Sequence, residues 1–292
     1  MKGFLALADG TVFRGDSVGA EGSAFGEAVF TTAMSGYQET VTDPSYARQI
    51  VCFTAPMIGN YGVAAERSQS SRVHATAVVM REARGPHWTD WLHEHGIVAL
   101  TGIDTRSLVL HLREHGAMGA AAVAGDASVD EVLTAVREQP AMAGAALVAD
   151  VSPDERYTFA AEGDVRVAVV DYGVKRSILT LLQRNGAAVD VYPHDVDADT
   201  LAGYDGVLLG NGPGDPAPLA AETHVVRDLL GRTPVLGVCL GHQLLAQATD
   251  RKTFKLPFGH RGANHPVVDH RTRRVLVTSQ NHGFAVEASE DE

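Results

Sequence analysis

The sequence contains little cysteine, little basic charge and no long apolar segment. Its 292 residues include only two cysteines, Cys52 and Cys239, which excludes a disulfide framework and suits a reducing compartment. Lys and Arg number 24 against 36 Asp and Glu, a formal net charge of -12, so we expect no nucleic acid and no membrane among its partners. The start "MKGFLALADG" has too short an apolar run for a signal peptide, and no run approaches a membrane span. We therefore expect a cytoplasmic protein.

What is present is an ordinary globular composition, 45% hydrophobic and 21% charged, in a chain long enough for two domains. In the first half, the glycine turns "ADGT", "AEGSAFG" and "MSGYQ" separate short β-type runs, "EAVFTTAM" and "RQIVCFTA", which predict β-hairpins. Two helices follow, "DTRSLVLHLREHGA", capped by Asp104 or Thr105 and ended by Gly116, and "SVDEVLTAVREQ". Residues 1–151 are thus predicted to form a mixed α+β domain.

From residue 164 the pattern changes to alternating buried strands and amphipathic helices, beginning with "VRVAVVDYG" and "VKRSILTLLQRNG". This βαβ spacing predicts a doubly wound, mostly parallel α/β domain over residues 164–292, joined by a polar linker at 152–163, so the fold class is α/β. Sites in such sheets form at the carboxyl ends of strands. The loop "GNGPGDP" and Cys239 both follow predicted strands.

Cys239 lies between Gly237 and Gly241 in "VLGVCLGHQLLAQA", where a strand should turn sharply into a helix that begins at Leu240. We expect the helix terminus to favour the thiolate and its N–H groups to bind an oxyanion. The alternative, a buried structural cysteine, better fits Cys52, which has no glycine pair around it. The loop "GNGPGDP" is either an oxyanion-binding nest or a plain turn, and it lacks the spacing of a nucleotide P-loop.

The motifs "GVCLGHQ" and "NGPGDP" together resemble a class I (triad) glutamine amidotransferase domain. Three further stretches, "FTTAMSGYQETVTDPSYARQI", "GHRGANHPV" and "SQNHGFAV", resemble the small, glutamine-hydrolysing subunit of carbamoyl-phosphate synthase, from Gly3 to Val286. The resemblance implies that Cys239 attacks the side-chain amide of L-glutamine, releasing ammonia and then glutamate through a thioester. It implies a large-subunit partner that makes carbamoyl phosphate from bicarbonate with ATP and magnesium, for arginine and pyrimidine biosynthesis. No cofactor is implied in this chain.

By motif position, the resemblance also implies residue roles. Cys239 would be the nucleophile, and the backbone N–H groups of Gly212 and Leu240 would form the oxyanion hole. The residues expected to bind L-glutamine are Ser45, Gly212, Gly214, Leu240, Gln243, Asn281, Gly283 and Phe284. The residues themselves leave Ser45 and Asn281 open as turn formers and Phe284 as a core residue. No metal site is expected, because the spacing of His260, His265 and His270 fits neither one helix face nor a zinc knuckle.

The family's catalytic histidine, and the glutamate that orients it, belong to a His-Pro-Glu-like motif downstream of "NHGFAV", and the sequence reaches "VEASEDE" without one. His242 would point away from the elbow, and none of His260, His265, His270 and His282 lies at the base position. We therefore expect a carboxy-terminally truncated, incomplete glutaminase domain that is impaired in turnover. The alternatives are a non-catalytic partner of the large subunit, or a domain serving another synthase, against which the amino-terminal domain argues.

Overall fold

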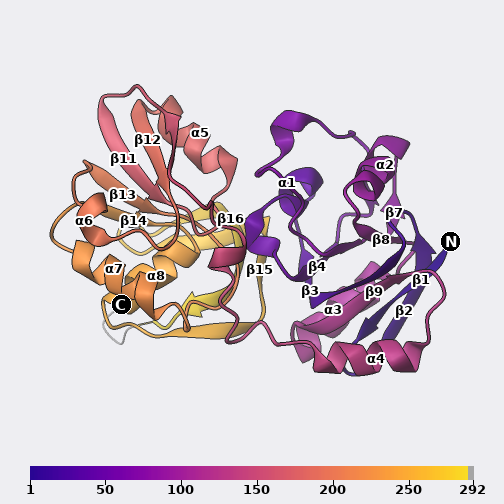
Figure 1. Ribbon diagram of the computed structural model, residues 1–292. Coiled ribbons are helices and arrows are strands. Elements are labelled where there is room, and N and C mark those ends of the chain that lie inside the picture. Colours follow the sequence, from indigo (N-terminus) through magenta and orange to yellow (C-terminus); the bar gives the residue numbers. More distant parts are fainter. Residues whose placement is uncertain (289–292) are drawn as a thin grey trace. The chain divides into compact units, whose positions relative to one another are not determined.

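The computed structural model describes residues 1–288; Ser289 to Glu292, most of the "EASEDE" tail, lie outside the described residues. The chain forms two compact units (Figure 1). The first unit comprises Met1–Thr42, Tyr46–Ala141 and Pro257–Gly283, and the second comprises Asp43–Ser45, Met142–Leu256 and the chain from Phe284 onward. Within the described part of the chain, no helix has both the length and the apolar character needed to cross a membrane.

The first unit is built on a closed barrel with the strand order β1-β2-β8-β6-β4-β3-β9. Its strands are β1 (Lys2–Leu7), β2 (Val12–Ser17), β3 (Gly22–Thr31), β4 (Gln49–Phe53), β6 (Ala77–Val79), β8 (Val98–Thr101) and β9 (Met118–Ala124). One face of the strands packs into a single apolar cluster with Leu108 and Leu112 of α3 (Thr105–His115). Cys52 lies in this cluster and is 2% exposed, so it is a structural core residue.

Helices cover the other face of the barrel strands in two places. Val132 and Val136 of α4 (Val129–Glu138) pack on β1 and β9, and Trp88 of α2 (Pro86–Glu94) packs with Tyr37 of α1 (Tyr37–Val41). The remaining short elements of this region are β5 (Met57–Ile58), which pairs with β7 (Glu82–Ala83), and the 3₁₀ turns η1 (Pro44–Tyr46) and η2 (Ala65–Arg67). The first unit is therefore a mixed α+β structure.

The predicted local elements of this unit are partly confirmed. β1 and β2 form the expected antiparallel hairpin, with Gly10 of the turn at a φ of 99°. The two predicted helices are present, and Asp104 caps α3 by accepting a hydrogen bond from the Ser107 amide (3.1 Å). The hairpin expected from "EAVFTTAM" and "RQIVCFTA" is wrong, because β3 and β4 pair in parallel. The intervening α1 and η1 return the chain to the start of the neighbouring strand, which a tight turn would not do.

The second unit contains the predicted parallel sheet, in the order β10-β12-β11-β13-β14. Its elements are β10 (Tyr157–Ala160), β11 (Val165–Val170), α5 (Arg176–Arg184), β12 (Ala187–Tyr192), α6 (Ala198–Leu201), β13 (Gly206–Leu209), α7 (Ala220–Leu229), β14 (Val235–Gly237) and α8 (Leu240–Ala248), with the 3₁₀ turn η3 (Val148–Asp150) before them. One face of the sheet packs against α6, α7 and α8 and the other against α5, so the sheet is doubly wound (Figure 1).

The chain winds outward from β11, with β12 on one side and β13 on the other, so the order of the sheet reverses between β11 and β13. Ligand sites of open α/β sheets form at such a reversal, beyond the carboxyl ends of the strands. The Gly210–Pro216 loop leaves the end of β13, and Cys239 follows β14 beside it. The fold therefore supplies a candidate site where the sequence places its two motifs.

The boundaries of the units differ from the predicted ones in two respects. The expected linker, 152–163, contains β10, which pairs antiparallel with β12 and belongs to the second unit. A two-stranded ribbon, β15 (Thr253–Asp269) with β16 (Arg274–Val286), contributes residues 257–283 to the first unit. The first difference arises because β10 pairs with β12, whereas the ribbon pairs only with itself and is joined to the first unit by contacts such as the hydrogen bond from the Thr32 amide to the Arg261 carbonyl (3.0 Å).

Candidate active site

Cys239 occupies a strained turn between β14 and α8. Its φ of 52° and ψ of -108° lie outside the conformations that residues with side chains normally adopt. A Cβ atom on Gly237 would lie 2.5 Å from the Gly241 backbone, and one on Gly241 would lie 2.2 Å from the Leu209 carbonyl oxygen. Only glycine fits at either position. The expected strand-to-helix elbow is confirmed.

Two backbone hydrogen bonds fix this elbow to the end of β13. The Val238 amide donates to the Leu209 carbonyl (3.0 Å), and the Gly241 amide donates to the Gly210 carbonyl (3.0 Å). The turn is thus held by the neighbouring strand and by the first turn of α8. This support explains how the chain maintains a backbone conformation that is unfavourable in isolation.

The thiol of Cys239 is less acidic than we expected from its helix terminus. Burial raises its pKa to about 11, and the negative charge of Asp43 acts in the same direction. Lys175 and the backbone N–H groups of Leu240 and Gly212, which donate hydrogen bonds to the sulfur, lower the pKa but do not offset burial. The N–H groups at the helix terminus thus favour the thiolate, as expected, but desolvation of a charged sulfur outweighs them, so the resting group is the thiol.

Gly212 and Leu240, the two residues expected to form an oxyanion hole, direct their backbone N–H groups at the Cys239 sulfur. Both donate to the Cys239 sulfur, so an oxyanion on the carbon bonded to that sulfur would lie near the same N–H groups. At Gly212 a Cβ atom would lie 2.2 Å from the Tyr172 carbonyl oxygen, so a larger residue would displace the loop. The loop "GNGPGDP" is thus closely packed around its glycine rather than a loose surface turn.

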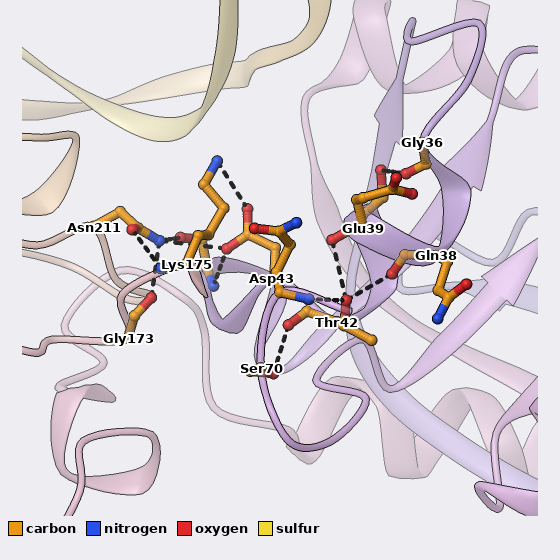
Figure 2. A network of polar contacts seen from close by, with 12 residues as sticks. Gly36, Gln38, Glu39, Thr42, Asp43, Ser70, Gly173, Lys175 and Asn211 are labelled. Atoms are coloured by element: carbon orange, nitrogen blue, oxygen red, sulfur yellow. Dashed lines mark hydrogen bonds and ion pairs between the residues drawn. The ribbon is translucent and has the colours of Figure 1, made fainter. Parts of the chain in front are cut away.

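Asn211 links this loop to the segment Asp43–Ser45 within the second unit (Figure 2). Its Nδ2 donates to Ser45 Oγ (3.0 Å) and to the Gly173 carbonyl (2.9 Å), and its Oδ1 accepts from the Lys175 amide (3.1 Å). The Ser45 amide in turn donates to Asp43 Oδ1 (2.9 Å). Ser45 is therefore held against the Gly210–Pro216 loop, although it is far from it in sequence.

Lys175 brings a positive charge into the same group. Its Nζ lies 3.7 Å from Asp43 Oδ2, whose side chain is only 5% exposed. Both charges act on the Cys239 thiol, Asp43 raising its pKa and Lys175 lowering it. The site thus combines a thiol, two backbone donors and an ion pair.

Comparisons with known proteins identify the family of the chain. The family model described as "Carbamoyl-phosphate synthase small chain, CPSase domain" matches residues 5–122, and the model described as "Glutamine amidotransferase class-I" matches residues 168–292. The carbamoyl phosphate synthase small chain of Xylella fastidiosa is 42% identical over 97% of this chain and 82% of that protein, and that of Thermotoga maritima is 48% identical over 98% and 76%. The chain belongs to the carbamoyl phosphate synthase small chain family.

Among solved structures, the chain is similar to a putative GMP synthase protein from Thermoplasma acidophilum, with a TM-score of 0.38 and 22% identity over 42% of this chain and 66% of that one.

Three other residues that are predicted to bind glutamine lie in the second unit. Gln243 is 5% exposed, and its Nε2 donates to the Phe284 carbonyl (2.8 Å), so α8 holds the start of the terminal segment. Phe284 itself packs with Met142 and Leu147. Gly214, with a φ of 90°, pairs through its backbone with Ala146. The glutamine-binding roles of Gln243, Phe284 and Gly214 stay predictions for this member of the carbamoyl phosphate synthase small chain family.

The remaining predicted residues lie elsewhere in the chain. Asn281 and Gly283 are on β16 and belong to the first unit. His260, His265 and His282 gather there too, with ring centroids 5.6 Å (His260–His265) and 5.0 Å (His260–His282) apart. No group of three or more His, Cys, Asp or Glu suited to a metal ion occurs among residues 1–288.

Sequence reasoning missed Asp43, Lys175 and Asn211 as parts of the site. Asn211 lies inside "GNGPGDP" and Asp43 two residues before Ser45, so both were adjacent to quoted motifs. Lys175 follows the end of β11, the strand at the reversal point of the sheet. A search for polar residues just beyond the carboxyl ends of the predicted strands would have found Lys175 and Asn211.

Proposed function

We propose that the chain is a glutamine-hydrolysing subunit, in which Cys239 attacks the side-chain amide of L-glutamine and ammonia passes to a separate large subunit. That partner would make carbamoyl phosphate from bicarbonate, using ATP and magnesium, so this chain needs no cofactor of its own. The observation that carries the proposal is the Cys239 elbow, whose sulfur accepts hydrogen bonds from the Gly212 and Leu240 N–H groups. A purely structural cysteine would not need a strained backbone between two obligatory glycines.

The proposed reaction has two stages. The thiol first gives up its proton, the sulfur forms a bond to the amide carbon, and the carbonyl electron pair moves to oxygen, where the Gly212 and Leu240 N–H groups stabilise it. The C–N bond then breaks, and the nitrogen leaves as ammonia after accepting a proton. Water next attacks the thioester, which releases glutamate and returns the thiol. Both stages need a group that accepts and returns a proton.

The other residues would hold the substrate. Ser45, placed by Asn211, and Gln243, on the first turns of α8, are the proposed polar contacts to glutamine in the second unit. Gly214 and Phe284 would form the adjoining backbone and apolar parts of the pocket. Asn281 and Gly283 are proposed as further glutamine-binding residues from the motif "SQNHGFAV".

The test is glutamate release and covalent labelling by a glutamine-analogue diazo-ketone, measured on the wild type and on Cys239→Ser. We expect label and activity on the wild type and neither on the variant, while Cys52→Ala, a change in the barrel core, retains both. The wild type, Cys239→Ser and Cys52→Ala should each form a stable complex with the large carbamoyl phosphate synthase subunit. Labelling of folded Cys239→Ser at Cys52 would refute the assignment of the nucleophile.

We further propose that the 292 residues by themselves turn glutamine over slowly and serve mainly as a partner of the large subunit. The thiol pKa of about 11 means that attack requires a proton acceptor. His242, the histidine nearest to Cys239 in sequence, is exposed on α8. We expect a small fraction of the turnover rate of a chain extended with a segment that carries a His-Pro-Glu-like motif. Equal rates in the two folded proteins would mean that a histidine already present is the base, and His282 would be the first to replace.

A further inference from the structure

A pocket of about 280 Å³ lies in the first unit, between the end of β4 and one face of α3. Six residues line it, namely Thr54, Thr105, Arg106, Val109, Leu110 and Arg113. All of them belong to the first unit, and none takes part in the chemistry proposed for Cys239. The volume lies just below the range for drug-sized ligand sites, which starts at about 300 Å³, so a ligand here would be small.

The hydroxyl group of Thr105 lacks a partner although its residue is buried. Thr105 is only 6% exposed and lines the pocket, yet its side chain makes no hydrogen bond to any other residue between 1 and 288. The hydroxyl oxygen itself is not among the fully buried unpartnered atoms of residues 1–288, so it opens into the pocket rather than into the packed core. The Thr54 hydroxyl, on the β4 side, likewise has no hydrogen-bond partner among the described residues.

Two arginines on the same face of α3 are also unpaired. Arg106 and Arg113 are exposed and line the pocket, and their guanidinium groups form no ion pair or hydrogen bond with a described residue. The neighbouring carboxylates have other contacts. Asp104 accepts from the Ser107 amide and hydroxyl (3.1 and 2.9 Å), and Asp9 contacts His111 (2.6 Å).

The placement of Arg106 runs against local helix electrostatics. It is the second residue of α3, where the helix dipole favours a negative rather than a positive charge. An anion bound there would interact favourably with both the guanidinium and the helix terminus. In a chain with a net charge of -12, two unpaired arginines around a pocket form a local positive site.

We propose that this pocket binds a small organic anion. Its carboxylate or phosphate oxygens would accept hydrogen bonds from the guanidinium groups of Arg106 and Arg113 and from the hydroxyls of Thr54 and Thr105. Arginine suits this task because its planar fork matches both kinds of oxyanion. The apolar part of the ligand would lie against Val109 and Leu110, and Leu110 is 50% exposed without one.

The test is titration of the full 292-residue chain with succinate and, separately, with inorganic phosphate. Binding is followed by calorimetry and by the amide NMR shifts of residues 104–113, with sodium chloride at matched ionic strength as the reference. We expect saturable binding of at least one probe, weakened about tenfold or more by Arg106→Gln and by Arg113→Gln. Arg184→Gln is the matched control, because Arg184 is exposed on α5, outside the pocket, and loses the same charge.

Thr105→Val separates a ligand contact from a role in folding. The substitution keeps the shape of the side chain and removes only a hydroxyl that has no partner in the described protein. We expect weaker anion binding with a melting temperature at or above that of the wild type. The proposal is overturned if neither probe binds saturably, or if Arg106→Gln and Arg113→Gln bind as tightly as Arg184→Gln.

Discussion

The reactivity of Cys239 should depend steeply on pH between 7 and 10. With a thiol pKa of about 11, the thiolate makes up about one molecule in ten thousand at pH 7 and one in a hundred at pH 9. Because the thiolate is the reacting species, alkylation by iodoacetamide should accelerate about a hundredfold over these two pH units. A thiol with a pKa near 7 would accelerate only about twofold over the same range.

The assay is the rate of iodoacetamide labelling at Cys239, measured by mass spectrometry at several pH values with folding checked at each. Cys52 provides an internal reference, because burial raises its pKa to about 12 and its side chain is 2% exposed, so it should not label in the folded protein. Cys239→Ser should remove the signal. A labelling rate that levels off below pH 9 would refute the conclusion that burial dominates at this sulfur.

Two charge variants test the causes of this pKa separately. Lys175→Met removes the positive charge that lowers the pKa of Cys239, so labelling at a given pH should be slower than in the wild type. Asp43→Asn removes the negative charge that raises it, so labelling should be faster. The two variants should shift the pH profile in opposite directions without changing its slope. Shifts in the same direction would show that the two side chains act through structure rather than through charge.

Three further predictions concern the stability of each unit. Gly237→Ala should destabilise the second unit and abolish glutamine hydrolysis, since its Cβ atom would lie 2.5 Å from the Gly241 backbone. The control is Gly203→Ala, whose Cβ atom would have no other atom within 4 Å and which should melt like the wild type. Equal melting temperatures for the two variants would contradict the packing argument. Asp171 is buried and its pKa is raised to about 6, so the native state holds a proton that the unfolded state releases, and stability falls as pH rises from about 4 to 6. Asp171→Asn should therefore stabilise the protein by up to about 3 kcal/mol at pH 7.5 and little at pH 4, as measured by denaturant titration at both pH values. Trp88 is 0% exposed, and its replacement by alanine should lower the free energy of unfolding by about 3–5 kcal/mol. A loss below about 1 kcal/mol would mean that the surrounding side chains collapse into the cavity.

The parts of the fold that the sequence predicted correctly depend on local information. The β1–β2 turn needs only Asp9-Gly10, and the start of α3 needs only Asp104 three residues before an amide that it caps. The elbow was predictable because Gly237 and Gly241 are required by atoms within one turn of Cys239 and by the adjacent strand. The parallel sheet followed from the alternation of strands and helices, which records the crossovers directly.

The parts that differed depend on pairing between distant segments. β3 and β4 look like two strands of a hairpin, yet they pair in parallel, because α1 and η1 return the chain to the start of the neighbouring strand. β10 lies in a polar stretch and is a strand only because β12 offers it an edge. Asp43 reaches Lys175 for the same reason that Ser45 reaches Asn211, since the fold brings the segment Asp43–Ser45 into the second unit.

At Cys239 the sequence predicted the direction in which the helix terminus changes the thiol pKa, but not the size of the opposing effect of burial. A helix N-terminus stabilises a nearby negative charge by about 0.3–1 kcal/mol, and rarely by about 2 kcal/mol, so it lowers a thiol pKa by at most about 1.5 units. The thiol pKa of about 11 lies above its ordinary value of 9.0 although the N–H groups of Leu240 and Gly212 and the charge of Lys175 lower it, so desolvation and the negative charge of Asp43 together exceed their sum. Burial depends on the whole packed unit, and no motif encodes it. The resting sulfur is therefore a thiol at neutral pH, and the attack proposed for Cys239 would depend on a separate proton acceptor.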